Sequence, residues 1–227
     1  MVIDASDLNY IEINDLIKNS EEEEVIIKNL ADAKYIGRGI KNKKIIFRGN
    51  VEREIGRELE ETKIIIEGNC EDAIGDKMKS GKIVVKGNVA DAPGYSMSGG
   101  KIYVKENAGY RVGIYMKQLQ IDEKSVIIVG GNVGDFLGQS QEGGTIIVLG
   151  LQKNGGSPVG RYCATDLKGG HIYIRSNVKP EDLNYNIILE ELNNGLEVQE
   201  HLMDFSKEFN IDYEKLINSK YFKISSR

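Results

Sequence analysis

The sequence lacks tryptophan and has only three prolines, two cysteines and two histidines among its 227 residues. The cysteines, Cys70 and Cys163, show no CxxC or Cys/His spacing, which argues against a zinc or iron site. No apolar run approaches the ~20 residues of a membrane-spanning helix, and no basic segment followed by an apolar one opens the chain. We therefore expect a cytoplasmic protein without a structural disulfide and without a membrane partner.

An excess of positive charge is also missing, because 30 Lys and Arg face 35 Asp and Glu, giving a net charge of −5. Binding to phosphate backbones needs a concentrated basic face, so nucleic acid is not an expected partner. Glycine, in contrast, is abundant at 26 residues. With so little proline, this composition predicts many tight turns between ordered segments and not a disordered or collagen-like chain.

One short phrase recurs along the chain at a fixed distance of 19 residues. It reads KIIFRGN at 44–50, KIIIEGN at 63–69, KIVVKGN at 82–88 and KIYVKEN at 101–107. Copies can be written from 25 to 170, and an eighth opens at 171 with HIYIR. A glycine in the second half of each copy keeps the same period and continues after two longer steps: Gly37, Gly56, Gly75, Gly94, Gly113, Gly138 and Gly160.

Each copy begins with a β-branched run and continues into turn residues, and no helical period is present inside a copy. Such a unit buries its apolar face only by stacking on its neighbours, so equivalent strands pair in parallel. We predict an all-β fold, a right-handed parallel β-helix that forms a single-stranded solenoid of about seven coils. Alternation directs columns beginning at Ile45 and Phe47 inward, and Tyr103 and Tyr173 outward.

The two ends of the chain lack the repeat. We predict an N-terminal cap over 1–24 with a helix at 7–19, the β-helix over 25–176, and a helical tail over 177–227 with helices at 190–209 and 212–222. Because open solenoid ends expose unpaired strand edges, we expect these helices to cap them. A role of the helices in clasping a partner chain stays open.

Two coils carry extra residues, at 117–124 and 151–158. Insertions in a solenoid emerge as loops, often on a binding face. The second insertion leads into Arg161 and Tyr162, so Pro158, Arg161 and Tyr162 form a candidate docking loop. An irregular corner fits the same residues equally well, and the roles of both loops stay open.

We assign no catalytic, cofactor-binding or metal-binding residue. Asp72, Asp91 and Asp135 each precede a periodic glycine by three residues and would stack into a partial column. A carboxylate column could bind a cation or perform acid–base chemistry, as in carbohydrate-cleaving β-helix enzymes. We favour the simpler interpretation that each aspartate accepts a hydrogen bond in its own turn. Cys163 has no histidine placed to activate it and is expected to be a small core or corner residue.

The stretch GGNVGDFLG at 130–138 places Gly131, Gly134 and Gly138 in a spacing that resembles the G-x-x-G-x-x-x-G repeat of the GXGXG family. The stretches IDASDLNYIEINDL near the start, GYRVGIYMK at 109–117 and GGTIIVLGL at 143–151 extend the similarity. Together they look like the stand-alone form of the C-terminal domain of the glutamate synthase large (alpha) subunit. Formylmethanofuran dehydrogenase has a GXGXG subunit that is related to the same family.

The resemblance implies a non-catalytic scaffold subunit of a glutamate-synthase-like oxidoreductase, serving glutamate biosynthesis and ammonia assimilation. It implies protein partners, namely a central FMN and iron–sulfur domain and a glutamine amidotransferase domain, with FMN and the iron–sulfur cluster in the partner and no cofactor in this chain. The alternatives are a protein like the GXGXG subunit of formylmethanofuran dehydrogenase and a free-standing β-helix enzyme acting on polysaccharide. The nitrogen donor, the partners' identity and a homo-oligomeric state stay open.

Overall fold

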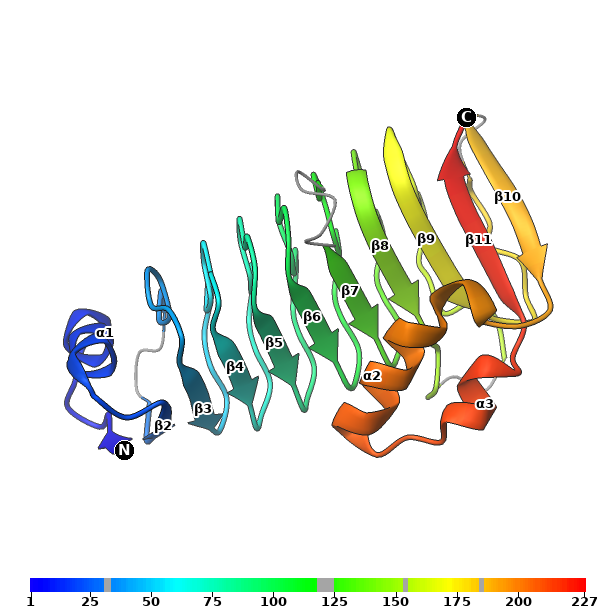
Figure 1. The fold of residues 1–227 in the computed structure, drawn as a ribbon. Helices are drawn as coiled ribbons and strands as arrows, with labels where there is room; N and C mark the ends of the chain where they lie inside the picture. The colour runs from blue at the N-terminus through cyan, green and yellow to red at the C-terminus, as the bar shows by residue number, and fades with distance from the viewer. Residues whose placement is uncertain (31–33, 118–124, 153–154, 184–185) are drawn as a thin grey trace.

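The computed structural model describes residues 1–30, 34–117, 125–152, 155–183 and 186–227. One sheet of 11 strands runs through them in the order β1-β2-β3-β4-β5-β6-β7-β8-β9-β11-β10. Figure 1 shows these strands side by side along an elongated stack of coils. Most of the insertion at 117–124 and part of that at 151–158 lie outside the described residues.

The repeated phrase forms the strands of the solenoid. They are β2 (Glu24–Lys28), β3 (Lys44–Arg48), β4 (Lys63–Ile66), β5 (Lys82–Val85), β6 (Lys101–Val104), β7 (Val126–Val129), β8 (Glu142–Val148) and β9 (Gly169–Arg175). Each pairs in parallel with the next. A second series of parallel bridges joins the coils on another side, from Val51 to Cys70 and onward to Val159. The predicted parallel β-helix is confirmed.

The interior is filled by the two predicted columns. Ile45 pairs with Ile64 and Phe47 with Ile66, and the same register continues from coil to coil. All these side chains are fully buried, in the order Ile45, Ile64, Ile83, Ile102, Ile127, Ile146, Ile172 and Phe47, Ile66, Val85, Val104, Val129, Val148, Ile174. Burial of a column of like side chains therefore holds successive coils in register.

A ladder of asparagines follows the strands at the first turn of the coil. The Oδ1 of Asn50, Asn69, Asn88 and Asn107 accepts the backbone N–H of the next asparagine at 2.8 to 3.1 Å. The position after Asn132 is held by Pro158, since Val133 N bonds Pro158 O. Proline has no N–H to donate, and within the described residues Asn132 Oδ1 has no partner. The ladder ends at Pro158.

At the N-terminal end, α1 (Tyr10–Asn19) covers the first coil, as the sequence predicts (Figure 1). Asn9 caps it, because its side chain accepts hydrogen bonds from the backbone N–H groups of Ile11 and Glu12. Ile13 and Ile17 are fully buried in the solenoid core. A short strand that the sequence did not predict, β1 (Val2–Asp4), pairs in parallel with β2 and extends the sheet.

The C-terminal tail differs from the predicted pair of helices. It contains β10 (Ile187–Leu192), the 3-10 helix η1 (Leu196–Val198), α2 (Gln199–Phe209), α3 (Tyr213–Ile217) and β11 (Tyr221–Ser226). The predicted helices at 190–209 and 212–222 were therefore too long. β11 inserts antiparallel between β9 and β10, and its Phe222 and Ile224 pair with Ile174 and Ile172. Residues 221–226 form a strand and not a helix because the strand continues both core columns and covers the open edge of β9.

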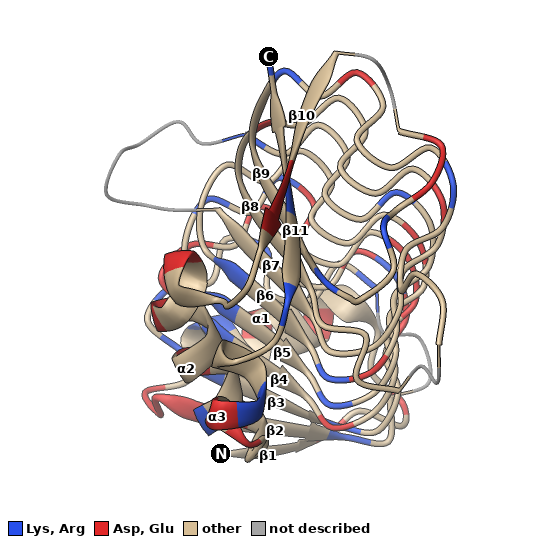
Figure 2. Ribbon diagram, turned by 90° about the vertical axis from the view of Figure 1, so that its right-hand side faces the viewer, with Lys and Arg blue, Asp and Glu red and all other residues tan. Residues whose placement is uncertain are grey.

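The helices α2 and α3 lie on the outer face of the sheet and not over the end of the rod (Figure 1). Figure 2, a view along the rod from the β10 side, shows both helices on the strand side of the coils. Tyr103 and Tyr173 point out of the solenoid, as predicted, but they are only 0% and 5% exposed because the helices cover them. Phe205 of α2 packs edge-to-face on Tyr103, with ring centroids 5.6 Å apart.

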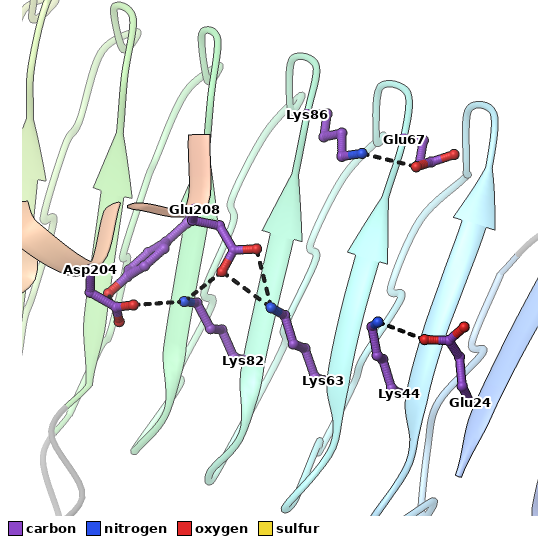
Figure 3. Close-up of polar contacts among 9 residues, drawn as sticks. Glu24, Lys44, Lys63, Glu67, Lys82, Lys86, Asp204 and Glu208 are labelled. Atoms are coloured by element: carbon purple, nitrogen blue, oxygen red, sulfur yellow. Dashed lines mark hydrogen bonds and ion pairs between the residues drawn. The ribbon is translucent and has the colours of Figure 1, made fainter. Parts of the chain in front are cut away.

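Ion pairs fasten α2 to the sheet. Lys63, Lys82 and Lys101 stand at the same register on three neighbouring strands. Lys82 Nζ lies 3.1 Å from Asp204 Oδ1 and 2.8 Å from Glu208 Oε2 (Figure 3). Lys63 reaches Glu208 at 3.1 Å and Lys101 reaches Asp204 at 2.9 Å. We call these five side chains the lysine clasp.

Candidate protein-docking face

Each coil makes a tight corner at which a residue adopts a left-handed backbone. In three consecutive coils that residue is Arg111 (φ +58°), Phe136 (φ +62°) and Tyr162 (φ +58°). Non-glycine residues adopt this conformation uncommonly, and bulky ones least of all. The two coils before them place alanine there, at 73 and 92, and the first two coils place Tyr35 and Glu54 there. Strained positions of this kind cluster at functional sites, so large side chains here call for a function.

Aromatic side chains gather at this corner in the C-terminal half of the rod. Tyr162 stacks on Phe136, with ring centroids 5.0 Å apart and planes 19° apart. The guanidinium carbon of Arg111 lies 5.6 Å from the centroid of the Phe136 ring. Beyond Gly113 in the same coil as Arg111, Tyr115 meets Tyr95 of the preceding coil edge-to-face, with ring centroids 5.8 Å apart. We call the set the aromatic edge: Tyr95, Tyr110, Arg111, Tyr115, Phe136 and Tyr162.

The tyrosine rings of the aromatic edge remain open to solvent, and Phe136 is partly buried. Tyr110 is 50% and Tyr162 is 49% exposed. Tyrosine, phenylalanine and arginine are enriched in the centres of protein–protein interfaces, where they act as rigid anchors with few rotatable bonds. Stacking and cation–π contacts fix the rings before any partner arrives, which reduces the entropy that docking must remove. Chemically, this surface is suited to binding protein.

The candidate docking loop is divided by the structure. Tyr162 joins the aromatic edge, and Arg161 next to it donates its backbone N–H to Asp135 Oδ1 at 2.8 Å. Pro158 lies elsewhere, beside a cavity at the end of the rod. Sequence reasoning missed Arg111 and Phe136, although both occupy the position equivalent to Tyr162 in the preceding coils. Aligning the coils at this corner would have found them.

The aspartate column serves the backbone of the following coil. Asp72 Oδ1 accepts the N–H of Asp91 at 3.0 Å, and Asp91 Oδ1 accepts the N–H of Tyr110 at 2.8 Å. The predicted turn hydrogen bond therefore exists, but its donor is in the next coil and not in the aspartate's own turn. Each carboxylate accepts a backbone hydrogen bond with one oxygen and so holds the next coil in place, which favours a structural role over acid–base chemistry.

The GXGXG motif family matches residues 9–226 of the chain. The chain belongs to the GXGXG family. A relative from the archaeon Methanocaldococcus jannaschii, described as "Uncharacterized protein MJ1350", is 35% identical over 240 residues, which cover 99% of this chain and 92% of the relative. The similarity thus extends over the solenoid and both ends of the GXGXG chain.

The motif glycines of the GXGXG chain fall into distinct columns. One column has positive φ two residues after the left-handed residue of each coil, and it consists of Gly37, Gly56, Gly75, Gly94, Gly113 and Gly138. Gly160 does not belong with them: it stacks on Gly134, and a Cβ on it would lie 2.3 Å from Asp135 Oδ1. Ala164, with φ +60°, takes the corner position instead. The predicted step to Gly160 was wrong because the longer insertion moved the register.

Gly131 and Gly134 lie against the preceding coil. A Cβ on Gly131 would lie 2.3 Å from Asn107 Oδ1, and one on Gly134 would lie 3.0 Å from the Gly109 carbonyl. In this chain, the close approach of backbone between neighbouring coils therefore explains the glycines of the motif. No ligand is needed to account for it.

Both cysteines are buried and unpaired. Burial raises the pKa of the Cys163 thiol to about 12 and raises that of Cys70 further. Thiols that stay protonated at neutral pH are poor nucleophiles. The described residues hold no group of three or more His, Cys, Asp or Glu arranged to bind a metal ion. None of the helices they form is long and apolar enough to cross a membrane.

Proposed function

We propose that this chain is a non-catalytic scaffold subunit of a glutamate-synthase-like oxidoreductase assembly. The family membership supports this role, because the resemblance links the chain to the C-terminal β-helix of the glutamate synthase large subunit. The partner is the polypeptide that carries FMN and an iron–sulfur cluster, and an amidotransferase chain completes the assembly. This chain supplies a rigid rod of fixed length, on which partners are held at a set spacing and orientation.

The aromatic edge is the surface on which the partner docks. The observation that carries this assignment is the stack of Tyr162 on Phe136, held at left-handed backbone positions, with the Tyr162 side chain half open to solvent. Arg111 lies over the Phe136 ring and adds a cation to the edge. The matching surface of the flavin-bearing partner therefore presents apolar groups with a carboxylate near the position of Arg111.

Affinity purification of the full chain from its native host tests the proposal. The expected result is co-purification of a polypeptide with flavin absorbance and bound iron, together with an amidotransferase chain. Recovery of the chain by itself in repeated preparations would contradict the scaffold role. Recovery with a molybdenum or tungsten protein would instead assign it to a formylmethanofuran dehydrogenase-like assembly.

A further inference from the structure

A cavity of ≈ 580 Å³ opens at the C-terminal end of the solenoid, away from the residues of the aromatic edge. Its walls come from four parts of the chain: the glycines and proline at 150, 155, 156 and 158, the end of β9 and the residues after it at 175–178, Asn193, and the segment before β11 at 218–220. Small-molecule sites range over about 300 to 1,000 Å³. The volume is therefore that of a site for a small ligand.

The charges around this cavity are of one sign. Its lining residues include Arg175 and Lys220 and no aspartate or glutamate among the described residues, although the chain as a whole carries a net charge of −5. The remaining polar lining is dominated by the amide side chains of Asn177, Asn193 and Asn218. Cations together with amide N–H donors form a site that is electrostatically matched to an anion.

Two hydrogen bonds hold the Arg175 guanidinium in place through Nε and Nη1 and, among the residues that the structure describes, leave Nη2 free. Its Nε donates to Ser219 Oγ at 2.8 Å and its Nη1 donates to the Leu149 carbonyl at 3.0 Å. Within the described residues, Nη2 donates to no acceptor, so two N–H groups of a fixed, half-buried guanidinium remain for a ligand. A guanidinium fixed in advance binds carboxylate or phosphate with little further loss of entropy.

Lys220 supplies the second charge. Its Nζ lies 5.8 Å from the centroid of the Phe222 ring and pairs with Glu191, whose side chain is 56% exposed and lies outside the cavity wall. An exposed ion pair of this kind is weak. Lys220 can therefore exchange Glu191 for an anion in the cavity at small cost. Across the cavity, a Cβ on Gly155 would meet nothing within 4 Å.

We propose that this cavity binds a small oxyanion, a carboxylate or a phosphate, through Arg175 Nη2 and Lys220 Nζ. The site depends neither on the docking partner nor on the proposed assembly, because both cations and the cavity belong to this chain.

Isothermal titration calorimetry of the full chain tests this site, with inorganic phosphate in one arm and succinate in the other, in chloride buffer of matched ionic strength. We expect saturable binding of at least one probe with a Kd of about 1 mM or below. The Lys220→Met variant keeps the stem over Phe222 and loses only the charge, so we expect binding at least about fivefold weaker. Lys105→Met, which removes an exposed lysine away from the cavity, is the matched control and should bind like the wild type.

The stronger arm identifies the source of the oxyanion, phosphate-bearing or carboxylate-bearing. Arg175→Lys retains the charge but loses the fork, and it should also weaken binding in a protein whose melting curve remains cooperative. If that variant does not fold, Lys220→Met decides the question. Absence of saturable heat in both arms, or equal weakening by Lys105→Met and Lys220→Met, would overturn the proposal.

Discussion

A Cβ placed on Gly113 would lie 2.5 Å from Cδ1 of Ile146, a core side chain of the next-but-one strand. The same relationship joins Gly94 to Ile127 and Gly138 to Ile172. The corner glycine and the inward isoleucine are thus two parts of one packing arrangement. At Ala164 the corner residue is no longer glycine, and the next-but-one strand of the sheet is β11, which runs antiparallel and places Ile224 opposite Ile172.

Replacing this glycine measures the packing directly. Gly113 (φ +68°) and Gly39 (φ +69°) have the same backbone strain, but a Cβ on Gly39 would meet nothing within 4 Å. We expect Gly39→Ala to lower the free energy of unfolding by about 1 kcal/mol from backbone strain. Gly113→Ala should cost about 1 to 3 kcal/mol more, because it overpacks the core. Urea unfolding checks both variants, and equal losses would refute the packing explanation.

The lysine clasp predicts a local effect on α2. Asp204→Asn removes the acceptor shared by Lys82, Lys101 and the hydroxyl of Tyr103. The expected loss of stability is about 1 kcal/mol, since the Asp204 side chain is 35% exposed and solvent screens the pairs. Hydrogen exchange should rise in α2 and not in β2 or β3. Glu24→Gln, which breaks the exposed pair of Glu24 with Lys44 (Figure 3), is the control and should change neither.

The same clasp gives stability a dependence on acid pH. Burial alone would raise the pKa of Asp204, but hydrogen bonds from Lys101, Tyr103 and Lys82 outweigh it and hold that pKa well below its usual range. The pKa of Glu208 is lowered in the same way by Lys82 and Lys63. Carboxylates with depressed folded-state pKa stabilise the fold fully above their unfolded values, about 3.9 and 4.3, and lose this contribution as pH falls further.

We therefore expect wild-type stability to fall between about pH 5 and pH 2, with a smaller fall in Asp204→Asn. Urea midpoints measured across this range check it. Identical pH profiles for the two proteins would show that Asp204 contributes nothing to acid stability.

The buried thiols provide a probe of opening. Because Cys70 is 4% and Cys163 is 1% exposed, a thiol reagent should label neither in the native state until the coils open. Labelling should therefore be faster in Gly113→Ala than in Gly39→Ala, because the less stable variant opens more often. Labelling at the rate of a free thiol in the wild type would contradict the packed interior.

The solenoid could be predicted from the sequence because one residue type repeats at one period. The columns at Ile45 and Phe47 are written directly in the repeated phrase, and the structure confirms their register. The tail could not be predicted in the same way, because Tyr221, Phe222 and Ile224 fit a helix pattern as well as a strand pattern. Only the open edge of β9, a long-range feature, selects the strand.

The candidate docking face of the structure shares only Tyr162 with the candidate docking loop of the sequence. The sequence indicates Arg161 and Tyr162 because they follow an insertion. Phe136 lies inside the glycine motif, which the sequence analysis assigns to the scaffold. Its stacked position becomes visible only when the coils are aligned at the corner, since the stacking partner Tyr162 is 26 residues away. The cavity beside Arg175 had no signal in the sequence, because its walls come from four segments that meet only in the fold.

The affinity of the chain for the proposed flavin-bearing partner tests the account most directly, measured by calorimetry on wild type, a Phe136→Asn/Tyr162→Asn variant and the control Met203→Asn. Asparagine adopts the left-handed backbone of positions 136 and 162 more readily than most residues, so the double variant should fold as stably as the wild type. Met203 is a comparably exposed apolar side chain on α2, away from the corner. We predict binding at least about 30-fold weaker for the double variant, the loss of a hot spot of about 2 kcal/mol, and wild-type affinity for the control. Unchanged affinity in a folded double variant would contradict the central claim that the aromatic edge holds the partner.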